Sequence, residues 1–216
     1  TRDGFIATRD VSGQWAVSPV PGLFSLTTDN GGTIPQNAVI SVSCPSENMC
    51  LSGGVFKYGA QNNLFSGFVS TYANGSWGTA VEVPGLASLN VADNPRVNNI
   101  FCPSDNNCVV IGTVKPSASL TLGFIAELVD GVWEDASIVP NLEVLHVSGG
   151  VSFEALDCAA NGECVAGGRY WDGSQFVPFV TIQQSGNWSA VAPVNQFNSL
   201  HTNPVNNVTL QHVDCF

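Results

Sequence analysis

Short runs of strand-forming residues recur along the chain, and each ends at a cysteine. The runs read VISVSC, NNIFC, EALDC and LQHVDC. Each carries an apolar residue two positions before its cysteine, and these residues are Val42, Ile100, Leu156 and Val213. A fixed apolar position in a short β-prone run predicts a strand that packs one face on a neighbour.

Three more strands are expected after each of these runs. The next stretches, LSGGVF, VVIGTV and VAGGRY, carry a repeated glycine that suggests a close backbone approach or room for an aromatic ring. A third strand starts near a phenylalanine and a fourth at a tryptophan nine or ten residues later. We call these residues the frame Phe (Phe5, Phe68, Phe124, Phe179) and the frame Trp (Trp15, Trp77, Trp133, Trp188). Tight hairpins are expected between the two strands at the pairs Asn74-Gly75, Asp130-Gly131 and Ser185-Gly186.

The whole pattern repeats at an even spacing. Cys44, Cys102, Cys158 and Cys215 follow one another at intervals of 58, 56 and 57 residues. Tandem units of four antiparallel strands are typical of propeller blades, so we predict an all-β chain that forms one β-propeller domain over residues 1–216. The expected blades span approximately 40–96, 97–150 and 151–206, and a fourth is shared between 1–39 and 207–216. That shared blade would lack one hairpin, so a longer native chain with more blades is the alternative.

Six cysteines form three close pairs across the expected hairpins. The pairs are Cys44/Cys50, Cys102/Cys108 and Cys158/Cys164. Zinc is the rival interpretation, but zinc pairs usually lie two to four residues apart and must converge, whereas blades would spread these pairs around a ring. We therefore predict three disulfides and an oxidising compartment. Cys215 is left without a partner, which we expect to lie in the missing hairpin; a reactive catalytic thiol is the less favoured explanation.

The cysteine segments also resemble a known family. CPSENMCLSGG, CPSDNNCVVIG and CAANGECVAGG, each followed by a frame Phe and an (N/D/S)-G-x-W turn, are similar to the cysteine-paired β-propeller repeats of secreted bacterial proteins. Those repeats open with C-x-S-x-x-x-C-x-A-x-G. The resemblance covers nearly the whole chain and implies a propeller fold and secretion, while no catalytic residue carries over from it.

Composition narrows the choice of partners. Only 11% of the residues are charged, and six basic residues face seventeen acidic ones. A net charge of −11 would repel a polyanion, so we expect no nucleic-acid partner. The chain contains no apolar run of about 18 residues, the length that a membrane span needs. We expect a secreted or cell-surface protein.

Long connections lead from each frame Trp to the next cysteine run, and a ligand is expected to bind there. Each holds a leucine predicted to anchor the core, followed by a polar residue that differs between copies; the leucines are Leu26, Leu89, Leu145 and Leu200. The candidate ligand-binding residues are Asn90, Asp93, Arg96, His146 and His201 in or near these connections, His212 on an inner strand, and Trp171 at a hairpin tip outside the frame. The histidines could hold a metal, but hydrogen bonding in loops is the favoured interpretation and no metal site is predicted.

The function expected from these features is binding of a glycan or a protein. A propeller-type glycoside hydrolase or lyase is one alternative, because acids such as Asp157 and Asp214 would line the channel. The chain has no recognisable catalytic motif, so a non-enzymatic role is favoured. A structural subunit of an oligomeric surface assembly is the other alternative. No cofactor is expected, and a cation bound in the channel is left as an alternative.

Overall fold

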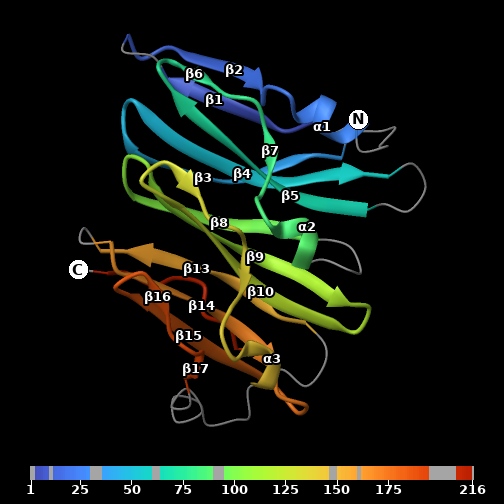
Figure 1. Cartoon of the computed structure of the whole chain (residues 1–216). Helices are drawn as coiled ribbons and strands as arrows, with labels where there is room; N and C mark the ends of the chain where they lie inside the picture. Colours follow the sequence, from blue (N-terminus) through green and yellow to red (C-terminus); the bar gives the residue numbers. More distant parts are fainter. Residues whose placement is uncertain are drawn as a thin grey trace.

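The computed structural model shows an all-β chain, as predicted. It describes residues 3–9, 12–29, 36–59, 64–89, 95–145, 150–159, 162–194 and 208–215. Three similar antiparallel sheets follow one another along the chain, and a two-stranded hairpin precedes them (Figure 1). A closed ring with a blade shared by the two ends stays a prediction.

The elements follow the repeat. The hairpin consists of β1 (Phe5–Arg9) and β2 (Trp15–Pro19) and leads into α1 (Leu23–Asp29). The first sheet contains β3 (Ala38–Ser46), β4 (Met49–Tyr58), β5 (Leu64–Ala73), β6 (Ser76–Trp77) and β7 (Val81–Glu82), followed by α2 (Leu86–Leu89). The second contains β8 (Arg96–Ser104), β9 (Asn107–Ser117), β10 (Leu120–Val129), β11 (Val132–Trp133) and β12 (Ser137–Ile138), followed by α3 (Leu142–Leu145). The third contains β13 (Ser152–Cys158), β14 (Cys164–Trp171), β15 (Phe176–Gln184), β16 (Asn187–Trp188) and β17 (Ala192–Pro193).

The predicted fourth strand of each sheet appears as two short pieces. In the first sheet both β6 and β7 pair with β5. Tyr72 lies opposite Trp77, whereas Phe68 lies opposite Glu82, so one extra residue separates the two pieces. An extra residue on one strand is a β-bulge. The second and third sheets repeat this interruption, because β12 and β17 pair with β10 and β15 in the same way.

The hairpins close where the sequence predicts. Asn74, Asp130 and Ser185 have φ angles of 53°, 49° and 51°, and each is followed by a glycine with positive φ. Two successive residues with positive φ form the turn that matches the right-handed twist of paired strands. The three turn pairs are therefore confirmed.

The core is built from the frame and from the connections. Three frame Phe side chains, Phe68, Phe124 and Phe179, are completely buried. Each connection contributes a buried leucine from the start of a short helix; these are Leu23, Leu86 and Leu142. The leucines predicted as anchors, Leu26, Leu89 and Leu145, are only half-buried beside the core, and Leu200 lies outside the described residues. The prediction chose the wrong leucine because one helical turn brings the first of the two inward.

Neighbouring sheets meet through their first strands. The Cys102 N–H donates to Ser43 Oγ at 3.0 Å, which joins β8 to β3, and Asn99 Nδ2 donates to the Glu154 carbonyl at 2.8 Å, which joins β8 to β13. The apolar residues predicted to pack on a neighbour, Ile100 and Leu156, are buried on β8 and β13. β3 differs, because the equivalent Val42 is exposed.

The segment 208–215 lies against the third sheet, beside which the chain ends in Figure 1. The Cys215 N–H donates to Asp157 Oδ2 at 2.6 Å, and Leu210 lies next to Gly167. The sequence predicts a first strand here, whereas residues 208–215 have no regular secondary structure. The segment takes the place of a first strand without the ladder hydrogen bonds of one.

All three predicted disulfides are present, Cys44–Cys50, Cys102–Cys108 and Cys158–Cys164. Each pair is separated by six positions and links a first strand to the second strand of the same sheet. A short loop closed in this way stabilises the folded chain by restricting the unfolded one.

We expect the double variant Cys102→Ala/Cys108→Ala to lower the free energy of unfolding by about 2.4 kcal/mol, the chain-entropy value for a loop of this length. Urea unfolding of the variant and the native chain measures the difference. Cys215→Ala, at the free and half-buried cysteine, is the matched control and should lose much less. An equal loss in both would assign the effect to side-chain packing.

Candidate functional site

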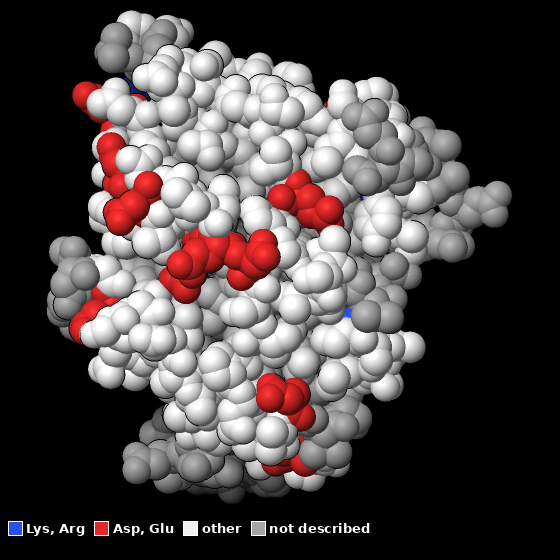
Figure 2. Space-filling view, viewed as in Figure 1, with Lys and Arg blue, Asp and Glu red and all other residues white. Residues whose placement is uncertain are grey.

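Four of the chain's six basic residues lie at one end of the sheets. Lys57, Arg96, Lys115 and Arg169 all lie toward the strand ends that are remote from the disulfides. We call this end the basic end. In Figure 2, by contrast, acidic side chains are scattered over the visible face and very little Lys or Arg is seen. Most basic residues of this acidic chain therefore lie toward one end of the three sheets.

A polar cavity of about 320 Å³ opens at the basic end between the second and third sheets. Arg96 and Lys115 supply two cationic side chains to its lining, and Glu154 supplies one carboxylate. Hydroxyl and amide groups complete the polar lining, from Asn98, Thr113, Thr121 and Ser152. We call it the basic-end cavity.

Strands of both sheets position these side chains. Arg96 begins β8 and lies opposite Thr113 on β9, while Ser152 begins β13. Asn98 Nδ2 donates to the Phe153 carbonyl at 3.0 Å and so connects the two sheets beside the cavity. Most of the lining therefore comes from strands and not from a single loop.

Trp171 lies at the tip of the β14–β15 hairpin, where the sequence places it. Its ring contacts Phe176 edge-on with 5.1 Å between centroids, and the Arg169 guanidinium lies 4.3 Å from the centre of the same Phe176 ring. Asp172 Oδ1 accepts the N–H groups of Gln175 and Ser174 at 2.9 and 2.7 Å, and these bonds hold the pKa of Asp172 below its ordinary value. The tip is a fixed turn that carries a half-buried tryptophan.

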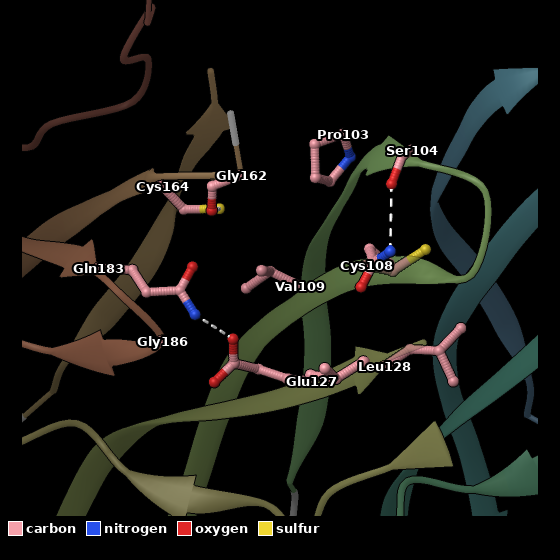
Figure 3. Close-up of a pocket in the computed structure, with 12 residues that line it drawn as sticks. Pro103, Ser104, Cys108, Val109, Glu127, Leu128, Gly162, Cys164, Gln183 and Gly186 are labelled. Carbon is pink, nitrogen blue, oxygen red and sulfur yellow. Dashed lines mark hydrogen bonds between the residues drawn. The ribbon is translucent and has the colours of Figure 1, made fainter. Parts of the chain in front are cut away.

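A second cavity of about 330 Å³ lies near the disulfides, also between the second and third sheets (Figure 3). Glu127 reaches across it to Gln183, which donates to its carboxylate, and Trp188 Nε1 donates to Glu127 Oε2 at 3.2 Å. Burial raises the pKa of Glu127, and the bonds from Trp188 and Gln183 partly oppose that rise. Glu127 is the only acid among the described residues that line this cavity, so it holds no pair of carboxylates of the kind that glycoside hydrolysis needs.

The structure places some of the predicted site residues and leaves others untested. Arg96 lies in the basic-end cavity and Trp171 at the hairpin tip of the third sheet. His212 is exposed in the segment 208–215. Asn90, Asp93, His146 and His201 lie outside the described residues.

Asp157, one of the two acids predicted to line a channel, has a structural partner. Asp157 accepts the Cys215 N–H, so this carboxylate anchors the segment 208–215. Burial raises the pKa of the Cys215 thiol, and the Asp157 carboxylate adds to the rise. A thiol with a raised pKa is a poor nucleophile, which argues against the reactive-thiol interpretation.

Lys115 was missed as a site residue, although the repeat contains a signal for it. Lys57 and Lys115 both lie three positions after the repeated glycine, and Trp171 takes that position in the third unit. Two of the three copies thus carry a lysine near the basic end. The hydroxyl and amide groups of the cavity gave no comparable signal, because they converge from four strands.

Among the described residues, no helix is long and apolar enough to cross a membrane, and no group of three His, Cys, Asp or Glu side chains could hold a metal ion. No family model matches the chain, and a search of the curated proteins finds no match.

Proposed function

We propose that the chain is a secreted or cell-surface binding module of the β-propeller type, and that its ligand is an acidic glycan held in the basic-end cavity. The observation that carries this proposal is the pairing of Arg96 and Lys115 in a polar cavity of a chain with net charge −11. Arginine binds carboxylate or sulfate with two parallel hydrogen bonds, and lysine adds a point charge. Nearby hydroxyl and amide groups suit the neutral hydroxyls of a sugar.

The propeller arrangement is the part of the proposal that concerns the fold. Its support is the repetition of similar four-strand sheets whose first strands are neighbours, β3 beside β8 and β8 beside β13. In a propeller such first strands surround the axis, and the connections gather at its ends. The hairpin and the segment 208–215 would then supply parts of one blade, brought together either within one chain or between two copies.

Three disulfides support a location outside the cell or at its surface. Bridges of this kind persist in oxidising surroundings and are rare in the reducing cytosol. A binding module outside the cell would meet acidic glycans carrying uronate, sialate or sulfate groups.

An array of neutral and acidic glycans tests the proposal. We expect binding to acidic members only, and we expect Arg96→Ala and Lys115→Ala each to weaken it about threefold to tenfold, since tenfold corresponds to about 1.4 kcal/mol. Arg9→Ala removes the same charge at the other end of the sheets and should change binding little.

Glu154→Gln is expected to change glycan binding in the opposite direction. Removing this carboxylate from the cavity lining should strengthen the binding of an anion, which no folding defect would do. Retention on neutral glycans, or equal losses in Arg9→Ala and Arg96→Ala, would contradict the proposed site. Trp171→Ala shows whether the bound glycan extends to the hairpin tip of the third sheet.

A further inference from the structure

One face of the hairpin is apolar and uncovered. Phe5 and Trp15 are 63% and 68% exposed, and Val17 beside them is also exposed. The frame Phe of every sheet is completely buried, and the frame Trp residues of the sheets are half-buried. The hairpin therefore carries the same frame side chains as the sheets, but among the described residues it lacks the neighbour that covers them.

The covering neighbour in the other copies is the preceding unit. Trp77 Nε1 donates to Thr8 Oγ1 at 3.4 Å, and Trp188 Nε1 donates to Glu127 Oε2 at 3.2 Å. Both acceptors lie three positions after the frame Phe of the preceding unit. The residue at that position in the third sheet is Ile182, which is 40% exposed.

β3 lacks its neighbour in the same way. Val42 is 54% exposed, whereas the equivalent Ile100 and Leu156 are buried against the preceding sheets. A mainly apolar groove of about 460 Å³ lies between β1 and β3, lined among others by Phe5, Trp15 and Val42. We call these three residues with Val17 the leading surface.

The third sheet carries a surface that could cover the exposed residues of the hairpin and β3. The segment 208–215 lies on it as a first strand of the next unit would, because the Cys215 N–H bonds Asp157 as the Cys102 N–H bonds Ser43. Asp214 occupies the same position in the repeat as Asp157 and Ser43, one before a cysteine, and it is exposed. We call Ile182 and the segment 208–215 the trailing surface.

We propose that the chain associates head to tail, with the leading surface of one copy covered by the trailing surface of a second copy. The segment 208–215 would then lie along β3, with Asp214 placed to accept the Cys44 N–H, and Trp15 would pack on Ile182. We choose a second copy as the partner because the same kinds of contact already join successive units inside the chain. Closure within one chain would use the same surfaces, but the structure leaves Phe5, Trp15 and Ile182 exposed.

Such a contact joins two different surfaces and so leaves one of each kind free in a pair. It forms a ring if the rotation closes and an open chain if it does not. The net charge of −11 opposes association of two copies at low ionic strength. Salt screens this repulsion, since the Debye length falls to about 3 Å at 1 M.

Sedimentation velocity of the 216-residue chain over a concentration series in high salt tests the proposal. The native chain should form species of at least twice the 22.6 kDa monomer mass. Trp15→Ser on the leading surface and Ile182→Asp on the trailing surface should each raise the dissociation constant at least tenfold. Val144→Ser, at an exposed valine of α3, is the control and should associate like the native chain.

Mixing the two variants identifies the geometry. A Trp15→Ser copy retains its trailing surface and an Ile182→Asp copy retains its leading surface, so the mixture should form a one-to-one dimer that does not grow. A mixture that stays monomeric while the native chain associates would overturn the head-to-tail contact. A native chain that is monomeric at every concentration would overturn self-association, and Trp15 shielded from a fluorescence quencher in that monomer would assign the contact to closure within one chain. Glycan binding is measured separately, so either proposal can fail alone.

Discussion

Phe124→Ala is expected to lower the free energy of unfolding by about 3 to 5 kcal/mol, whereas Phe5→Ala should change it by less than about 0.5 kcal/mol. The two residues occupy the same position in the repeat, but Phe124 is completely buried and Phe5 is largely exposed. Removing Phe124 loses its burial and leaves a cavity in the core that continues through the second and third sheets. Urea unfolding at concentrations where the chain is monomeric measures both values.

This pair of variants also reports what covers the hairpin. Exposed side chains contribute little to monomer stability, so a small effect of Phe5→Ala agrees with an uncovered leading surface. Equal losses in the two variants would mean that Phe5 is buried in the monomer, as ring closure within one chain requires. An effect of Phe5→Ala that grows with protein concentration would instead come from association between copies.

The strands, turns and disulfides could be predicted because each has a local signature that the repeat displays several times. Asn74-Gly75 and its two equivalents specify a turn through the conformations that these residues adopt. A separation of six positions in the sequence, with five residues between the cysteines, suffices for a bridge across a hairpin. A single copy of either signal would be weak, and its recurrence at an interval of about 57 residues makes it specific.

The short helices and the divided fourth strand could not be predicted in the same way. PGLFSLT carries two leucines three residues apart, Leu23 and Leu26, and a repeat alone does not reveal which one points inward. The bulge between β6 and β7 depends on the pairing with β5, which involves residues distant in the sequence. The exposure of Val42 could not be predicted either, because its burial depends on a neighbouring sheet and not on the sequence of its own strand.

The candidate site was predicted only in part for a related reason. Arg96 was among the predicted residues because it lies at the end of a long polar connection, whereas Lys115 reaches the same cavity from the end of β9. Ser152 belongs to the next sheet, more than fifty residues along the chain from Arg96. Spacing in the sequence identifies units, whereas a cavity between two units depends on how the sheets stack.

Gly112→Ala is expected to lower the free energy of unfolding by at least about 3 kcal/mol. A Cβ at Gly112 would overlap the Arg96 carbonyl oxygen of the neighbouring strand and lie 2.5 Å from Cε1 of Phe124. The first of these atoms is backbone and the second belongs to a completely buried ring, so neither can move without cost. Gly150→Ala is the matched control, because nothing lies within 4 Å of its added Cβ. Thermal or urea unfolding of both variants measures the difference.

The same overlap recurs at the equivalent glycines of the other two sheets. A Cβ at Gly54 would meet the Ala38 carbonyl, and a Cβ at Gly168 would meet the Ser152 carbonyl. Each glycine lies where the first strand bulges, between Val97 and Asn99 in the second sheet, and this irregularity brings the backbones together. We therefore expect losses of similar size in all three sheets, and a tolerated alanine at any of them would show that the bulge can relax. Since Arg96 and Ser152 both line the basic-end cavity, a shift of either strand at the bulge should also weaken glycan binding in whatever fraction of the variant still folds.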